Sequence, residues 1–116
     1  MFLTLTGKPI STNHAYKATC RGKFVTYYQT PAAKALKESW AFEAVTQYKD
    51  DPLEGDLSVT VRFYHKDKRK HDIDNYFKLL FDSLNGVLWV DDGQIIELIA
   101  QKYLDKDNPR VEVIVN

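Results

Sequence analysis

Residues 57–64 alternate apolar and polar side chains without interruption, and this pattern constrains the fold more than any other. The apolar set consists of Leu57, Val59, Val61 and Phe63, and the polar set consists of Ser58, Thr60, Arg62 and Tyr64. Successive side chains of a β-strand point to opposite faces, so a strict alternation predicts a strand with one buried face. The segment therefore indicates a half-buried strand within a sheet-containing fold.

Two other segments have the pattern of helices. Residues 31–49 follow Thr30, a favourable N-cap, and begin with Pro31, which suits the first helical position. Apolar residues recur every four positions in this segment, at Leu36, Trp40, Ala44 and Tyr48. Residues 75–84 are expected to form a second helix, with Asp74 as N-cap and Asn85-Gly86 as its stop. This second helix is apolar on more than one side, and a second subunit is a candidate for the extra cover.

Shorter segments complete the expected fold. Strands are predicted at residues 2–6, 87–90, 95–104 and 111–115, and residues 16–19 and 24–28 flank Arg21-Gly22 as a basic hairpin. No repeat and no linker divides the 116 residues. We therefore expect a single small domain over residues 1–116, of class α+β (mixed α/β), with a mixed β-sheet and two main helices.

Composition excludes several classes of protein. The apolar runs are too short to span a membrane, so no membrane partner is expected. Residues 1–8 lack a basic region followed by a long apolar core, so no secretory signal is expected. Cys20 is the single cysteine, which excludes an intramolecular disulfide and a cysteine-based zinc cluster. These features predict a cytoplasmic protein.

The formal net charge is zero, but the charges are segregated along the chain. Residues 1–30 carry four basic residues and no acidic residue, and residues 57–71 carry five basic residues against Asp67 alone. Residues 50–56 carry four acidic residues, and from Asp72 onward nine acidic residues face four basic ones. The neutral total therefore conceals basic blocks able to bind an anion such as DNA.

Four carboxylates follow the second basic block. Asp72 and Asp74 are expected at the junction of an extended segment and a helix, where residues two apart point to the same side. Asp91 and Asp92 are expected at the end of an apolar strand. Carboxylates brought together repel each other unless a cation lies between them. Mg²⁺ or Mn²⁺ prefers such oxygen ligands, and beside Lys and Arg it would support phosphodiester hydrolysis.

Each of these signals also has an ordinary structural interpretation. Asp74 can be only an N-cap, or the partner of Lys78 in an i,i+4 salt bridge. The Asp91-Asp92-Gly93 segment can be a hairpin turn, and residues 66–70 can be a solvated strand end. The combination of all of them is more specific than any one alone.

Other sites find no support in the sequence. An EF-hand beginning at Asp72 would need Gly and Glu where Phe77 and Ser83 stand. The sequence contains no P-loop, GxGxxG or HExxH motif, and no organic cofactor is expected. The three histidines, His14, His65 and His71, belong to no recognisable motif, and Cys20 is interpreted as incidental.

The acidic and basic segments together resemble the RusA-type Holliday junction resolvases, small endodeoxyribonucleases of bacteria and their phages. The resemblance lies in the basic run before Asp72-Ile73-Asp74-Asn75, then Lys78, Phe81-Asp82-Ser83-Leu84, and the segment from Leu88 to Ile95 that contains Trp89-Val90-Asp91-Asp92-Gly93. A weaker similarity involves Pro9, Ser11, Asn13 and Tyr16. Together these cover roughly residues 8–28 and 57–104, which is most of the chain.

The resemblance implies a mixed α/β homodimer that binds four-way DNA junctions and makes paired, symmetric, Mg²⁺-dependent cuts. It assigns Asp72, Asp74 and Asp92 to essential acidic positions, Asp91 to an adjacent acidic position and Lys78 to a functional lysine. The expected departures are His71, which directly precedes Asp72, and the neutral overall charge.

The expected mechanism follows from this assignment. Asp72, Asp74 and Asp92, supported by Asp91, would hold one or two Mg²⁺ ions, with Mn²⁺ as a substitute, and Lys78 would orient the nucleophile or offset charge on the phosphate. Backbone phosphates would be held by Lys66, Lys68, Arg69, Lys70, Arg21 and Lys23. Two incisions in a two-fold symmetric junction suit a homodimer.

Two other functions remain open at this point. One is a less selective metal nuclease of phage origin that acts on branched DNA, and the other is a non-catalytic DNA-binding protein of the same fold.

Overall fold

The core of the molecule is a four-stranded mixed sheet with the strand order β1-β6-β4-β5. Its strands are β1 (Phe2–Thr6), β4 (Leu57–His65), β5 (Ile95–Leu104) and β6 (Arg110–Val115). A computed structural model describes residues 1–116, apart from the side chain of Arg21. Strands β4 and β5 are parallel, whereas β6 runs antiparallel to both of its neighbours. The predicted single α+β domain with a mixed sheet is confirmed.

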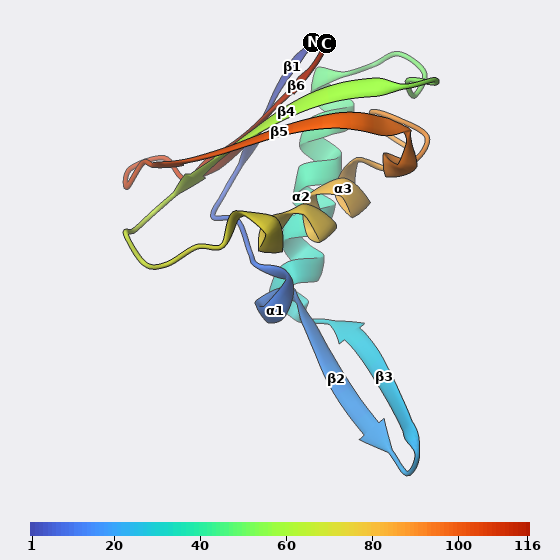
Figure 1. The fold of residues 1–116 in the computed structure, drawn as a ribbon, viewed down its shortest axis with the longest axis vertical. Coiled ribbons are helices and arrows are strands. Elements are labelled where there is room, and N and C mark those ends of the chain that lie inside the picture. Colours follow the sequence, from blue (N-terminus) through green and yellow to red (C-terminus); the bar gives the residue numbers. More distant parts are fainter.

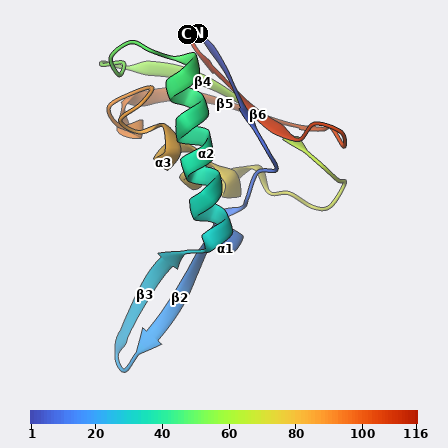
Figure 2. The same cartoon turned by 180° about the vertical axis from the view of Figure 1, so that it is seen from behind.

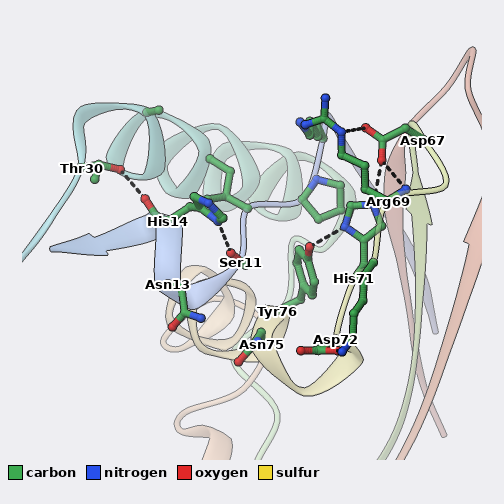
Figure 3. Close-up of a pocket in the computed structure, with 15 residues that line it drawn as sticks. Ser11, Asn13, His14, Thr30, Asp67, Arg69, His71, Asp72, Asn75 and Tyr76 are labelled. Carbon is green, nitrogen blue, oxygen red and sulfur yellow. Dashed lines mark hydrogen bonds and ion pairs between the residues drawn. The ribbon is translucent and has the colours of Figure 1, made fainter.

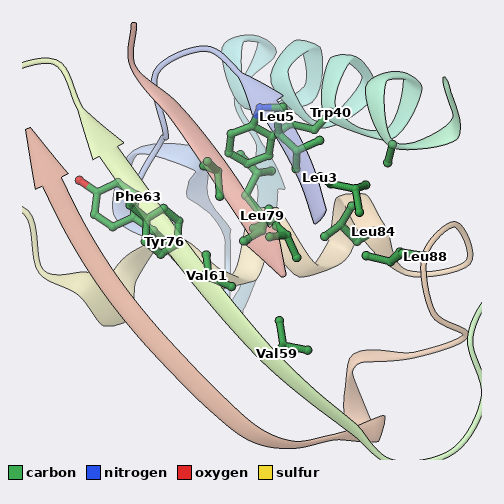
Figure 4. Packing of buried hydrophobic residues seen from close by; sticks show 14 of the residues in the cluster. Leu3, Leu5, Trp40, Val59, Val61, Phe63, Tyr76, Leu79, Leu84 and Leu88 are labelled. Atoms are coloured by element: carbon green, nitrogen blue, oxygen red, sulfur yellow. The ribbon is translucent and has the colours of Figure 1, made fainter. Parts of the chain in front are cut away.

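Helices cover one face of this sheet, as Figures 1 and 2 show. The long helix α2 (Pro31–Gln47) and the short helix α3 (Phe77–Leu84) are the two main helices, and α1 (Thr12–Ala15) is a single turn. The burial of β4 alternates along its whole length, as the sequence predicted. Its inward side chains Val59, Val61 and Phe63 lie in one core with Trp40, Leu79, Leu80 and Leu84 (Figure 4).

Helix α2 is fixed to the sheet edge by polar contacts as well as by packing. The Thr30 hydroxyl accepts a hydrogen bond from the backbone N–H of Ala33 at 3.3 Å, which confirms the predicted N-cap. Trp40 is buried and its indole N–H donates to the Thr6 carbonyl oxygen at 2.9 Å. The Glu43 carboxylate accepts from the Thr6 N–H at 3.1 Å. The bonds of Trp40 and Glu43 to Thr6 join α2 to the end of β1.

A separate two-stranded hairpin extends away from this body (Figures 1 and 2). It consists of β2 (Tyr16–Arg21) and β3 (Phe24–Gln29), which pair antiparallel. Gly22 at its tip has a φ of 60°, a conformation that glycine adopts without strain. The predicted basic hairpin is therefore confirmed, with slightly longer strands.

Two local predictions are wrong. Residues 87–90 form a turn with isolated bridges from Trp89 to Leu53 and Asn85, because Gly86 N donates to the Trp89 carbonyl at 2.7 Å and closes the chain on itself. The second helix is also preceded by a 3₁₀ turn, η1 (Ile73–Tyr76). In this turn the Asn75 N–H donates to the Asp72 carbonyl at 3.0 Å. Of the helices that the structure describes, none is long and apolar enough to cross a membrane.

The Trp40 contacts generate a prediction about stability. Substitution Trp40→Phe removes the donor to Thr6 and leaves a small void, so we expect the free energy of unfolding to fall by about 1–3 kcal/mol. Phe42→Ala on the same helix is the control, because Phe42 is 71% exposed and its loss should change stability by less than about 0.5 kcal/mol. Urea unfolding of both variants measures this, and equal losses would contradict the role of Trp40.

Candidate functional site

The loop between β4 and η1 is organised by Asp67. The Asp67 carboxylate accepts hydrogen bonds from the Arg69 backbone N–H at 3.1 Å and from His71 Nε2 at 3.0 Å. These two hydrogen bonds hold the pKa of Asp67 below its usual value. The bond from the Arg69 N–H has the larger effect, and the bond from the His71 side chain has the second largest. An ionised Asp67 therefore bonds to two later positions of the exposed basic loop, and these bonds bend the loop.

His71 fixes the end of this loop next to Asp72. In a neutral His71 ring, Nε2 donates to Asp67, so Nδ1 accepts from the Tyr76 hydroxyl at 2.8 Å (Figure 3). The ring also stacks on His65, with a centroid distance of 3.9 Å and an angle of 3° between the planes. Lys102 from β5 donates to the His71 carbonyl at 2.8 Å. The residue before Asp72 is thus tethered to three different elements.

His65 is a buried imidazole at the last position of β4, with 4% of its surface exposed. Its Nε2 has no hydrogen-bond partner among the described residues. Burial lowers the pKa of His65 to about 4, and the neighbouring His71 and Lys102 charges add to this effect. His65 is therefore a neutral, apolar-like platform between Phe63 and His71 at neutral pH.

Asp72 and Asp74 lie on either side of the first residue of η1. Asp72 occupies the N-cap position but makes no capping bond with its side chain, and its carboxylate lies 4.0 Å from Lys70 Nζ. Asp74 is exposed within the 3₁₀ turn. The prediction that Asp74 is the N-cap is wrong, because the helical backbone begins at Ile73, before it rather than after it. For the same reason the chain is not extended between the two carboxylates.

Lys78 lies in the first turn of α3 and is directed along the helix. Its ammonium group lies 3.6 Å from the Asp82 carboxylate and 5.2 Å from the centre of the Tyr16 ring. The Tyr16 hydroxyl donates to the same carboxylate at 3.0 Å. The alternative of an Asp74–Lys78 salt bridge is therefore wrong, since Lys78 pairs one turn forward with Asp82. Its side chain is 57% exposed and remains accessible to a ligand.

Asp91 and Asp92 have different environments in and before the 3₁₀ turn η2 (Asp92–Gln94). Asp91 caps the turn, because its carboxylate accepts from the Gly93 N–H at 2.9 Å and Gln94 returns a bond to its backbone. Asp92 accepts from the Asn85 amide at 3.3 Å, and Asn85 is in turn held by the Trp89 indole N–H at 2.7 Å. The hairpin-turn interpretation is wrong, since η2 leads into β5, which pairs with the distant β4.

The two acidic pairs lie at opposite ends of α3. Asp72 and Asp74 precede α3. Asp92 is bonded to Asn85, which is the C-cap residue of α3. An eight-residue helix is roughly 12 Å long. Among the described residues of one chain, no three His, Cys, Asp or Glu side chains form a group that could hold a metal ion. One copy of the chain therefore does not gather the predicted metal ligands.

A cavity of about 670 Å³ lies between the basic loop and the N-terminal segment. Arg69 and Asp72 of the loop line it together with Asn13 and His14 of the N-terminal segment (Figure 3), and Lys8 and Lys70 also line it. Lys66 and Lys68 are exposed on the same loop, beyond the end of β4 at His65. The predicted run of cations is therefore presented to solvent immediately before Asp72.

The hairpin cations lie at a different place. Lys23 is exposed at the tip, while the predicted DNA contact Arg21 falls outside the described side chains. The structure therefore presents two separate basic surfaces, one on the loop and one on the hairpin.

The comparison with protein families decides what kind of protein carries this arrangement. The family model for endodeoxyribonuclease RusA matches residues 6–116, which include both acidic pairs, the basic loop and the hairpin. The chain belongs to the RusA family. A curated relative, the uncharacterized protein YqaN of Bacillus subtilis (strain 168), is 27% identical over a 134-residue alignment. That alignment covers 97% of this chain and 92% of the relative.

Membership in the RusA family makes the chain a nuclease, a hydrolase that acts on DNA, and binding of branched DNA is a property of the family. The basic loop and the exposed carboxylates agree with this activity, because a nuclease must hold phosphates beside groups that take part in hydrolysis.

Sequence reasoning missed the network of Asp67, His71 and Tyr76 in this RusA-family site. The three histidines belong to no motif, so the sequence alone does not single them out. The alternation of β4 did contain a usable signal, since extending it by one step places His65 on the buried face after Phe63. A buried histidine directly before the basic loop indicates that the loop packs against the core and is not simply a solvated strand end.

The depressed pKa of His65 predicts how stability depends on pH. The unfolded chain takes up a proton on this histidine near pH 6.5, whereas the folded chain does so only near pH 4. The unfolded state therefore binds more protons in this window, and His65 should cost roughly 2 kcal/mol of stability between about pH 7.5 and about pH 5.

His65→Phe is the matched variant, because it keeps the stacking and removes the titration. Urea unfolding at the two pH values should show a smaller loss for His65→Phe than for the wild type. Equal losses would contradict the assignment of a buried neutral imidazole.

Proposed function

We propose that the protein is a Mg²⁺-dependent endonuclease that acts as a homodimer and resolves four-way DNA junctions by paired symmetric incisions. In this role it would serve DNA recombination and repair in the cytoplasm. The observation that carries the proposal is the position of two exposed carboxylates, Asp72 and Asp74, directly after an exposed basic loop. This combination would place phosphate-binding and metal-binding groups on one continuous segment, in a chain that belongs to a family of endodeoxyribonucleases.

The donor chemistry of the site suits Mg²⁺. Asp72, Asp74 and Asp92 supply carboxylate oxygens, the ligands that this cation prefers, and Asp72 makes no capping bond with its side chain. Asp91 is engaged in capping η2, which favours a supporting role over a direct one. Bound Mg²⁺ would supply an activated water and offset the negative charge of the phosphate. Mn²⁺ prefers similar ligands and is the expected substitute.

A second copy of the chain accounts for the separation of these ligands. If two α3 helices pack antiparallel about a two-fold axis, the N-terminal end of one helix lies beside the C-terminal end of the other. Asp72 and Asp74 of one copy would then approach Asp92 of its partner, and the symmetry would create two such sites. Two sites per dimer suit two incisions in one junction.

Exposed apolar residues support this dimer. The edge strand β5 and the turn before it expose Val90, Ile96, Leu98, Ile99 and Leu104 to solvent. Phe77 and Phe81 on α3 stack on each other at 5.3 Å and are only half-buried. A long apolar edge strand left free in solution is prone to association. Coverage by a second copy of the chain would explain why these apolar side chains are exposed in one copy.

The chain's own residues would then perform three tasks. Lys66, Lys68, Arg69 and Lys70 bind backbone phosphates without reading sequence. Lys78 would weaken its ion pair with Asp82 and bind the phosphate on which negative charge develops during hydrolysis. The Asp67–His71 bond holds the loop so that Asp72 faces the bound strand.

The Asp74→Asn substitution tests the proposal. It removes one negative charge and should reduce Mg²⁺-dependent cutting of a labelled four-way junction by at least about 100-fold, while junction binding survives or strengthens. Asp56→Asn changes an exposed acid outside the site and should leave cutting unchanged.

Gel assays with a four-way junction, a fork and a linear duplex read out both activity and selectivity. Undiminished cutting by Asp74→Asn would overturn the metal-site assignment. Equal cutting of the linear duplex would overturn junction selectivity and favour a general nuclease.

A further inference from the structure

The hairpin formed by β2 and β3 carries aromatic side chains in open solvent. Phe24 is 77% exposed, Tyr27 is 72% exposed and Tyr28 is 48% exposed. The strand pairing places Tyr28 opposite Lys17, and it places Phe24 on the same face nearer the tip. Tyr27 lies opposite Ala18 on the other face. One face of the hairpin therefore combines two aromatic rings with a cation.

An isolated hairpin of this kind has little intrinsic stability. A two-stranded ribbon is marginal in water, and here nearly every residue from Lys17 to Tyr28 is exposed. Contacts to the body are concentrated at its root, where the Tyr16 hydroxyl donates to the Asp82 carboxylate at 3.0 Å and the Thr30 N–H donates to the Ala15 carbonyl at 2.8 Å. The arrangement is that of an arm anchored at one end.

The charge of the arm identifies the chemistry of its partner. Residues 1–30 contain four basic residues and no acidic one, and both Lys17 and Lys23 are exposed. A partner with negative charge and flat apolar faces matches such a surface. Single-stranded nucleic acid has both properties, because its phosphates pair with cations and its bases stack on aromatic rings.

The root of the arm lies directly on the helix that carries the candidate site. Tyr16, the first residue of β2, donates to Asp82 of α3 at 3.0 Å, and its ring lies beneath Lys78. The Thr12 hydroxyl donates to the Asn75 carbonyl at 2.9 Å. Each strand has six residues, so the tip lies roughly 20 Å beyond this root. A strand bound along the arm would run toward Lys78.

We propose that the face of the hairpin containing Lys17, Phe24 and Tyr28 binds unpaired bases at the branch point of DNA by stacking. The inference rests on the proposed function for its substrate and adds a second DNA-binding element to it. The arm holds the DNA strand that leaves the branch point, and the contact of its root with α3 places that DNA strand next to α3.

Binding without metal tests the arm separately from catalysis. The probes are a fluorescent oligothymidine strand and a four-way junction with 2-aminopurine at the crossover, both in EDTA. Phe24→Ala and Tyr28→Ala should each weaken binding of the oligothymidine by about tenfold and reduce the change in 2-aminopurine fluorescence that binding of the wild-type protein causes. Tyr28→Phe should bind as the wild type does, because it keeps the ring.

Two control variants separate stacking from general damage. Tyr27→Ala alters the opposite face of the same hairpin, and Phe42→Ala removes an equally exposed ring from α2. Both should retain wild-type binding. Lys17→Ala should weaken binding and reduce the slope of log affinity against log salt by about one.

Three results would overturn the inference. These are unchanged DNA binding in Phe24→Ala and Tyr28→Ala, an equal loss in Tyr27→Ala, or a lower molar mass of Phe24→Ala in light scattering without DNA, which would assign the arm to a second copy. Junction cutting with Mg²⁺ is measured in parallel. A wild-type protein that binds oligothymidine through the arm but does not cut would refute the proposed nuclease mechanism and leave the arm standing.

Discussion

The burial of α3 beneath the sheet determines where the functional groups of this molecule lie. Leu79, Leu80 and Leu84 are almost completely buried against the inward side chains of β4. A helix packed in this way cannot turn or slide without opening the core, because protein interiors are close-packed. Asp72 and Asp74 are therefore held at one end of α3, and Asp92 is held at the other. The same packing fixes Lys78 on the exposed side.

Small polar networks orient the segments at both ends of α3. At the N-terminal end, Asp67 and Tyr76 hold the two ring nitrogens of His71. At the C-terminal end, the Trp89 indole holds Asn85, which in turn binds Asp92. Each network links a loop to a buried ring, so the loop positions depend on the core. A rigid body with oriented loops is suited to a nuclease that must place a phosphate accurately.

The sequence predicted the regular elements well because their signals are local. The alternation of residues 57–64 and the Thr30-Pro31 start of α2 both correspond to the structure. It failed where a tertiary contact decided the outcome. Residues 87–90 look like a strand, but Trp89 is drawn into the core and bridges to Leu53. Lys78 has acidic residues four positions away on both sides, and the contact with Tyr16 accompanies its pairing with Asp82. The acidic residues were identified, but their separation along α3 depends on the three-dimensional fold.

Sharing of the metal ligands between two copies of the chain is the central claim, and mixing two inactive variants tests it most directly. Asp74→Asn and Asp92→Asn homodimers should each be inactive on a four-way junction with Mg²⁺. A mixed dimer contains one site with Asp74 from one copy and Asp92 from the other, both intact. Unfolding and refolding the two variants together should therefore restore nicking of one strand, with roughly half of the chains in mixed dimers. Mixtures as inactive as the separate variants would contradict the shared site.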